Sequence, residues 1–350
     1  MNAPAHKHAG LNFPFADHPA AGQGNTVCEG IAWHRIPLPF ALNHVNCWLL
    51  GEPGNQVLVD TGVDDTATRD LWRKHLVNVP RHDGVPVPEQ LLVTHFHPDH
   101  MGLAGWFENA GTKLSGSKVE TDFAHALWHI DGQHYAEFYA QWYAANGLPD
   151  EAISAVKAHA NTYRLKVHQP PAASAWETLQ EGQVVNLGGH DYEVLAGRGH
   201  APDMIMLYRH TDHVLIAADQ VLPSITPNVS VMPRLPDNNP LDSFLTSLQR
   251  LRKLPEDTLV LPSHGAPFTG LYAKLDGLAH HHELRLAEVV AACAEPSSAF
   301  ELFAVLFGRK LDAQQTSFAL GESLAHLHFL EQQGQLTRTQ LNGVTRFVRH

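Results

Sequence analysis

The chain has few of the residues that mark a secreted, disulfide-bonded protein. Its 350 residues include only 3 cysteines, an odd number, and Cys28, Cys47 and Cys293 lie far apart in the sequence. Scattered cysteines argue against a disulfide framework and favour a reducing compartment. Residues 1–25 contain no apolar core of the kind a signal peptide carries, so we expect a flexible N-terminal tail and a cytoplasmic protein.

Long apolar runs and excess positive charge are also lacking. The sequence contains no run of 18 apolar residues, which argues against a transmembrane helix and a membrane partner. Lysine and arginine total 24 against 36 acidic residues, a net charge of −12 at pH 7. That balance disfavours nucleic acid as a partner. Bound cations would offset part of the charge locally, so a small anionic substrate stays compatible with it.

What the chain does have is a dense run of potential metal ligands at residues 94–102, Thr-His-Phe-His-Pro-Asp-His-Met-Gly. Polar groups this dense need water or a cation beside them. Gln90–Thr94 predicts a buried strand and Met101–Asn109 a helix, so the ligands lie on the loop between them. The first two histidines alternate along the chain and can share one direction, whereas the other two ligands lie beyond a turn. The loop can therefore serve two adjacent cations with His95, His97, Asp99 and His100.

Three more candidate ligands follow predicted strands downstream. Each is a histidine or an aspartate that comes after an apolar segment and stands beside a glycine or a turn. One such residue alone is more commonly a hydrogen-bonded turn residue, but three together favour metal ligation. They are His200, Asp219 and His264.

The order of these ligands resembles the metallo-β-lactamase superfamily. The matching pattern is His95-x-His97-x-Asp99-His100, followed by His200, Asp219 and His264, and Val59-Asp60-Thr61-Gly62 resembles an early strand-end motif of the family. The resemblance implies an α/β fold, the αββα sandwich, in which two mixed sheets lie between helices and the metals bind at one sheet edge. It places this domain at residues 26–272.

The resemblance also implies how the ligands divide between two divalent metal ions. The first ion would be held by His95, His97 and His200. The second would be held by Asp99, His100 and His264. Asp219 would bridge the two ions, and Asp60 would orient a ligand without binding metal. Imidazole and carboxylate ligands suit zinc, iron or manganese, and we expect zinc.

Differences within the superfamily narrow the implied chemistry. Antibiotic-hydrolysing members tend to lack a bridging aspartate matching Asp219, and flavo-diiron oxygen reductases replace one loop histidine with a carboxylate, whereas this chain has His97. The site is most similar to the glyoxalase II, tRNA-processing and lactamase-β-like-2 types. These are hydrolases of thioesters, esters or phosphodiesters. A sulfur dioxygenase branch with a single iron shares much of the motif, so it stays an alternative.

A mechanism follows from two such cations about 3.5–4 Å apart, which lower the pKa of a bridging water and polarise a substrate oxygen. Asp99 or Asp219 would hold the resulting hydroxide and carry its proton, so both are candidate catalytic residues. We expect a metal-dependent hydrolase acting on a thioester or ester of a small acyl substrate, with a phosphodiester such as RNA as the alternative. A binding protein without enzymatic activity would not need an open, bridged pair of metals.

A helical insertion is predicted over residues 118–172, between the metal loop and His200. Its aromatic residues recur at helical spacing. Two interpretations stay open: these side chains form a packing face against the sandwich, or they form a lid above the metals that contacts an acyl group. The residues are Phe123, Trp128, Tyr135, Phe138, Tyr139, Trp142 and Tyr143.

Residues 273–350 are predicted to form a small helical, winged-helix-like domain. We expect helices at Ser297–Phe307 and Thr316–Gln333 and a hairpin after Gly334. Its charge is nearly neutral, without a basic recognition face, so a structural or dimerising role is favoured and a homodimer is expected. The histidines 280–282 precede a helical pattern and point in different directions around its axis, which argues against a further metal site.

Overall fold

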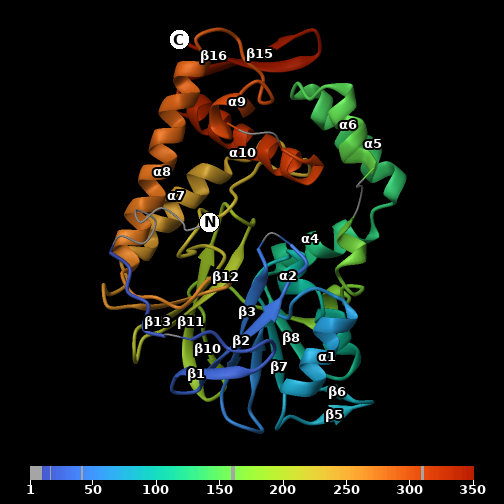
Figure 1. The fold of residues 1–350 in the computed structure, drawn as a ribbon, viewed down its shortest axis with the longest axis vertical. Helices are drawn as coiled ribbons and strands as arrows, with labels where there is room; N and C mark the ends of the chain where they lie inside the picture. The colour runs from blue at the N-terminus through green and yellow to red at the C-terminus, as the bar shows by residue number, and fades with distance from the viewer. Residues whose placement is uncertain (1–9, 16, 41, 159–161, 309–310) are drawn as a thin grey trace.

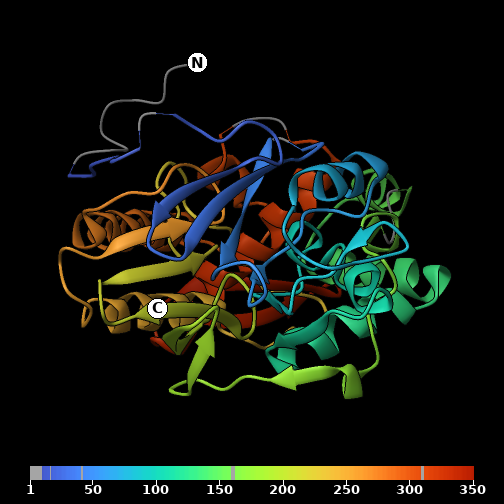
Figure 2. The same ribbon diagram turned by 90° about the horizontal axis from the view of Figure 1, so that it is seen from below.

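The computed structural model describes residues 10–15, 17–40, 42–158, 162–308 and 311–350. Two mixed β-sheets lie in adjacent layers in its lower half (Figures 1 and 2). The first sheet, in order across it, is β1 (Gly24–Cys28), β2 (Ile31–Pro37), β3 (His44–Leu50), β4 (Val57–Val59), β7 (Gln90–Val93), β8 (Lys113–Gly116) and β9 (Trp176–Thr178). The second is β10 (Val184–Leu187), β11 (His190–Gly197), β12 (Met204–Arg209), β13 (Val214–Ala218) and β14 (Leu259–Pro262).

Both sheets combine antiparallel and parallel strands. In the first, β1 to β4 are antiparallel and β4, β7, β8 and β9 run parallel. In the second, only β13 and β14 are parallel. Buried residues of the two sheets pack face to face, for example Trp48 and Leu50 with Tyr192 and Ile205. Successive side chains point to opposite faces of a sheet, and central strands such as β12 and β13 are buried at every position because both of their faces are covered.

Helices cover the outer faces, so the predicted αββα sandwich is confirmed. The first sheet is covered by α1 (Thr66–His75), α2 (Pro98–Met101) and α3 (Ala104–Asn109), where Trp72 and Phe107 reach the core. The second is covered by α7 (Pro240–Leu251) and α8 (Leu271–Ala292), where Phe244 packs with Tyr208 and Leu215. A small hairpin, β5 (Arg81–His82) and β6 (Val85–Pro86), follows α1.

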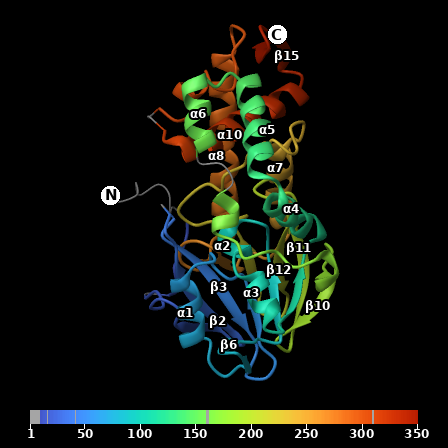
Figure 3. The same ribbon diagram turned by 90° about the vertical axis from the view of Figure 1, so that its right-hand side faces the viewer.

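The predicted insertion is helical, with α4 (Lys118–His129), α5 (Gly132–Ala145), α6 (Asp150–Ala158) and short 3₁₀ turns at Thr162–Leu165 and Ala173–Ala175. Its aromatic face serves two partners. Phe123 and Trp128 of α4 pack with the first sheet's core. On α5, Tyr139 and Tyr143 pack with the C-terminal helices instead, and the Tyr143 hydroxyl lies 2.6 Å from Ser317 Oγ. The sandwich-packing interpretation therefore holds for α4 and for Tyr135 in the first turn of α5, whereas the rest of α5 crosses to the C-terminal helices in the upper half (Figure 3).

The C-terminal segment forms α9 (Phe303–Leu306), α10 (Ala313–Gln332) and a hairpin of β15 (Leu336–Leu341) with β16 (Val344–Arg349). The hairpin and the second helix are confirmed. The helix expected over Ser297–Phe307 is wrong in length, because the backbone of Ser297 pairs with Phe347 of the hairpin and leaves only one helical turn. The predicted domain boundary at residue 272 falls in the first turn of α8, which runs on into the C-terminal helices.

The predicted N-terminal tail lies partly outside the described residues, at 1–9 and 16. Its described part is anchored: the backbones of Asn12 and Thr269 exchange hydrogen bonds, and the rings of Phe13 and Phe268 lie 6.3 Å apart. Across the part of the chain that the structure describes, every helix falls short of the length and apolar character needed to cross a bilayer.

Candidate metal centre

The seven candidate ligands meet at the edge of the sandwich that faces the C-terminal helices, beside α2 (Figure 1). They come from four chain segments, each placed by the end of a strand. The loop after β7 and the short helix α2 supply the first four residues, and the ends of β11, β13 and β14 supply the others. Their ligand atoms fall into two groups, and within each group all atoms lie within 4.8 Å of one another. The groups are His95, His97, His200 with Asp219, and Asp99, His100 with His264.

The first group has the spacing that one cation requires. His97 Nδ1 lies 2.9 Å from His95 Nε2 and 3.1 Å from His200 Nε2. Asp219 Oδ2 is 3.3 Å from His200 Nε2. A tetrahedral zinc ion with ligand bonds of 2.0–2.1 Å separates its ligand atoms by roughly 3.3 Å. The side chains are therefore already gathered around a volume that one ion would occupy.

The second group shares Asp219 with the first. His264 Nε2 lies 3.4 Å from Asp99 Oδ2, and His100 Nε2 lies 3.7 Å from the same oxygen. Asp219 reaches both histidines, with Oδ1 3.6 Å from His100 and Oδ2 3.5 Å from His264. Its carboxylate thus stands between the two groups, where a bridging ligand belongs.

Three buried polar atoms in this centre have no hydrogen-bond partner among the described residues: His100 Nε2, His264 Nε2 and Asp219 Oδ1. Leaving such atoms unsatisfied costs about 1–3 kcal/mol each. His100 Nε2 lies 3.6 Å from Asp219 Oδ1 and His264 Nε2 lies 3.5 Å from Asp219 Oδ2, and nitrogen and carboxylate oxygen are the ligand atoms that zinc, iron and manganese accept. The residues present therefore fit divalent metal ions.

Four of the five histidines are oriented by a hydrogen bond at Nδ1, which leaves Nε2 for the centre. His200 and His264 donate to the carbonyl oxygens of Asn228 (2.8 Å) and His44 (2.6 Å). His100 donates to Asp60 and His95 to Thr94 Oγ1. Such bonds fix the tautomer and the ring orientation of a metal ligand. His97 is reversed, with Nδ1 facing the centre.

Asp60 orients ligands in both groups. Its Oδ2 accepts from His100 Nδ1 at 2.7 Å and from Thr94 Oγ1 at 2.8 Å, and Thr94 in turn accepts from His95. Its Oδ1 accepts from the Thr94 backbone N–H at 2.8 Å. The backbone of Asp60 has φ of 62°, a left-handed conformation that aspartate and asparagine tolerate better than most residues. One buried carboxylate thus supports one ligand of each group.

Burial and neighbouring charges shift the pKa values of the candidate ligands in different directions. Burial, together with the neighbouring histidines, holds the pKa of His95 and His97 well below the usual value. Burial opposes the charge of His100 too, but Asp99, Asp60 and Asp219 outweigh it and raise its pKa to about 10. Burial alone would raise the pKa of Asp219, yet His264 and His100 hold it well below the usual range. Asp219 is therefore a carboxylate at neutral pH.

Three other polar residues form hydrogen bonds or close contacts with neighbouring parts of the fold. His282 lies on α8 with Nδ1 3.3 Å from His326 Nε2, and no group of metal-ligand type forms there among the described residues. Arg285 of α8 donates to the carbonyl oxygen of Leu306 in α9. The side chain of Asn228 accepts from Ser230 Oγ at 2.6 Å within its own loop and donates to Glu322 Oε2 of α10 at 3.4 Å.

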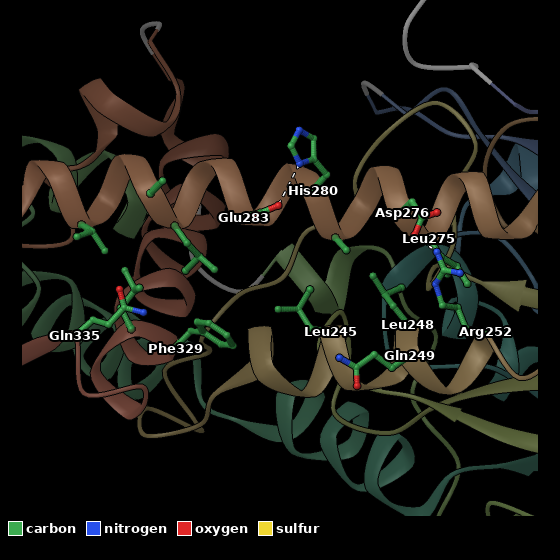
Figure 4. Close-up of a pocket in the computed structure, with 15 residues that line it drawn as sticks. Leu245, Leu248, Gln249, Arg252, Leu275, Asp276, His280, Glu283, Phe329 and Gln335 are labelled. Carbon is green, nitrogen blue, oxygen red and sulfur yellow. Dashed lines mark hydrogen bonds and ion pairs between the residues drawn. The ribbon is translucent and has the colours of Figure 1, made fainter.

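A separate cavity of about 830 Å³ lies between α7, α8 and α10 (Figure 4). Leucines such as Leu245 and Leu275 line it, with Phe329 at one end and the His280–Glu283 pair at its rim. None of the seven candidate ligands lines it. The chemistry therefore lies at the sheet edge and not in this cavity.

Comparison with known proteins agrees with this geometry. Residues 41–264 match the family model described as the metallo-beta-lactamase superfamily. Residues 286–350 match the model described as the metallo-beta-lactamase-like, C-terminal domain. The chain belongs to the metallo-beta-lactamase superfamily. The predicted family is confirmed, and the second match shows that the small domain after α8 accompanies this fold in other proteins.

Individual members of the superfamily extend the match over nearly the whole chain. A beta-lactamase domain protein from Burkholderia ambifaria is 39% identical, with a TM-score of 0.87 over 99% of this chain and 100% of that one. A metallo-beta-lactamase family protein from Thermus thermophilus is 30% identical, with a TM-score of 0.78 over 93% of this chain and 100% of that one.

Two curated relatives carry functional names. The probable metallo-hydrolase YqjP of Bacillus subtilis is 26% identical over 88% of this chain and 94% of its own length. The acyl-coenzyme A thioesterase MBLAC2 of Gallus gallus is 26% identical over 67% of this chain and 78% of its own. These matches confirm the predicted class of enzyme, a metallo-hydrolase.

Replacing Asp60 with asparagine is expected to weaken metal binding in both groups by about 10–100-fold, because outer hydrogen-bond partners of metal ligands contribute on that scale. Asparagine tolerates the left-handed backbone but offers one acceptor oxygen where three donors now converge. Competition with a chromophoric chelator measures the affinities. Thr94→Val is the matched variant: it removes the hydroxyl that joins Asp60 to His95 but keeps the Asp60–His100 bond, so it should weaken one metal and spare the other. Unchanged affinities in Asp60→Asn would refute the supporting role.

Proposed function

We propose that this superfamily member is a dinuclear metallo-hydrolase that cleaves thioesters of small acyl substrates. The observation that carries the proposal is the pair of ligand groups that share Asp219. One metal is assigned to His95, His97 and His200, the other to Asp99, His100 and His264, and Asp219 bridges them. The completeness of the second group supports two metals over the single iron of a sulfur dioxygenase.

The metals, when bound, supply an activated water and polarise the substrate carbonyl. The protein's own groups orient the ligands and handle the proton. Asp219 has both oxygens surrounded by histidines and is 7% exposed at its side chain, whereas the Asp99 side chain is 15% exposed. We therefore assign Asp99 as the group that accepts the proton of the attacking water and returns it to the leaving thiolate, with Asp219 holding the attacking oxygen in line.

Two cations beside the centre support an anionic substrate. Lys166 lies 3.7 Å from the centroid of the Phe40 ring; burial lowers its pKa, and the charge of Asp99 acts in the opposite direction. Arg234 lies 5.9 Å from the ring of Phe123, which packs on Phe96 of the metal loop. In a protein of net charge −12, neither cation forms an ion pair with any described residue. Both side chains can therefore form ion pairs with a negatively charged group of a thioester substrate.

The decisive experiment compares substrate classes on one preparation of metal-loaded protein. Thioesters of coenzyme A with short, medium and long acyl chains are assayed by thiol release, and an activated phosphodiester by phenolate release. We expect kcat/KM for the best thioester to exceed that for the phosphodiester by more than about 100-fold, a difference of about 2.7 kcal/mol in transition-state stabilisation. The reverse order would replace the thioesterase proposal with a phosphodiesterase.

A further inference from the structure

Glu120 is a buried carboxylate that the proposed mechanism does not use. Glu120 is the third residue of α4, in the helical insertion, and it is only 1% exposed. Buried acidic side chains are ordinarily paired with a cation or a metal. Glu120 forms no ion pair with any described residue, and it belongs to neither group of candidate ligands. The reason for a buried glutamate at this position must therefore lie in its hydrogen bonds.

Its two oxygens accept hydrogen bonds from two different ligand loops. Oε2 accepts from the backbone N–H of Phe96 at 3.1 Å, and Phe96 stands between His95 and His97. Oε1 accepts from the backbone N–H of Asp203 at 2.5 Å, three residues after His200. These donors belong to segments that leave different sheets, β7 of the first and β11 of the second. A single side chain thus ties together the two loops that supply the first metal's histidines.

Neighbouring residues of the insertion hold the same two points. The Tyr163 hydroxyl donates to the Phe96 carbonyl at 2.7 Å, and Ser117 Oγ donates to Asp203 Oδ2 at 2.8 Å. Both backbone groups of Phe96 and both the backbone and the side chain of Asp203 are therefore fixed from this side. Burial raises the pKa of Glu120 to about 8, although both backbone hydrogen bonds act to lower it, and of these three side chains Glu120 is the one that contacts both loops.

We propose that Glu120 is a positioning residue for the first metal: its carboxylate fixes the separation between the loop of His95 and His97 and the loop of His200, and so sets that site's affinity. The inference rests on the proposed assignment of those three histidines to one metal. The helical insertion supplies none of the candidate ligands, yet through Glu120 it would hold two of the loops that carry them. Glu120 acts through backbone position and touches neither substrate nor metal.

The test is Glu120→Gln, which keeps the size of the side chain but turns one acceptor oxygen into an NH₂ group facing an N–H donor. The first metal's affinity should fall by about 10–100-fold, with the second changed by less than about threefold. Chelator competition in a His264→Ala background reports the first site alone, because that change removes a ligand of the second metal only. Cobalt(II) absorption then shows whether the coordination of the remaining ion has changed.

Glu301→Gln is the matched control. Glu301 also accepts a backbone N–H, from Ser298 at 2.7 Å, and pairs with Arg346, but it lies in the C-terminal segment away from the ligand loops. It should lower the melting temperature without changing metal affinity. If Glu120→Gln does not fold, Glu120→Asp keeps the carboxyl group on a side chain too short to reach both loops, and the same loss of affinity is expected.

A folded Glu120 variant that binds the first metal with wild-type affinity overturns the positioning role, whatever its melting temperature. That result leaves the proposed function untouched, because the wild-type protein would still bind two metals. Wild-type protein that binds no metal overturns both proposals together. The two failures are therefore distinguishable in one set of titrations.

Discussion

Replacing Asp219 with asparagine is expected to lower turnover by more than about 100-fold while the fold stays intact. Changes to the outer partners of metal ligands cost about 10–100-fold, so loss of a bridging ligand should exceed that range. Both oxygens of Asp219 serve the centre, lying 3.3–3.6 Å from three histidines. Asparagine removes the charge and one acceptor. Steady-state kinetics measure the turnover, and plasma mass spectrometry measures the metal retained by each chain.

Asp212→Asn is the control for this change, because Asp212 precedes β13 and Asp219 follows it. Asp212 pairs at 2.6 Å with Arg209, which is buried. Its loss should lower the melting temperature and leave turnover unchanged. Asp219→Asn should show the opposite pattern. Turnover within about threefold of wild type in Asp219→Asn would contradict the bridging assignment, because a lost metal ligand costs far more.

The centre could be predicted from the sequence because its ligands carry two local signals. Four of them fall within six residues at 95–100, and the other three each follow an apolar strand. The order of these candidate ligands resembles that of the superfamily, and the resemblance implied that the strand ends meet at one sheet edge. The structure also shows details that the spacing of residues in the sequence does not predict. Examples are the reversed ring of His97 and the carbonyl of Asn228 that orients His200.

Glu120 and the partner of α5 could not be predicted, and for related reasons. A glutamate in the first turn of a helix is ordinary, since it complements the helix dipole. What distinguishes Glu120 is the identity of its partners, Phe96 and Asp203, which are 24 and 83 residues away. The helical spacing of the aromatic residues on α5 likewise predicted that this face packs against another part of the chain, but not against which part. Only the tertiary structure shows that Tyr143 meets Ser317 of α10 rather than the sandwich.

Removing the metals is expected to abolish hydrolysis and to lower the melting temperature. The centre gathers three buried atoms that find no hydrogen-bond partner in the described part of the chain, and ions that satisfy them bind the folded chain in preference to the unfolded one. At about 1,000 times the dissociation constant such binding adds about 4 kcal/mol of stability, which corresponds to a shift of roughly 5 °C for a chain of this size. Dialysis against a chelator, followed by calorimetry and the thioester assay, measures both effects.

Stepwise return of one metal at a time then decides how many ions the reaction needs. With Asp219 shared between the two ligand groups, activity should stay low after the first equivalent and rise with the second, because the attacking oxygen and the substrate carbonyl each need a cation. Zinc, manganese and iron are compared in separate titrations. Full activity at one equivalent of iron, with oxygen consumed, would make the sulfur dioxygenase alternative correct. Full activity in protein stripped of metal would refute the metal-dependent mechanism itself.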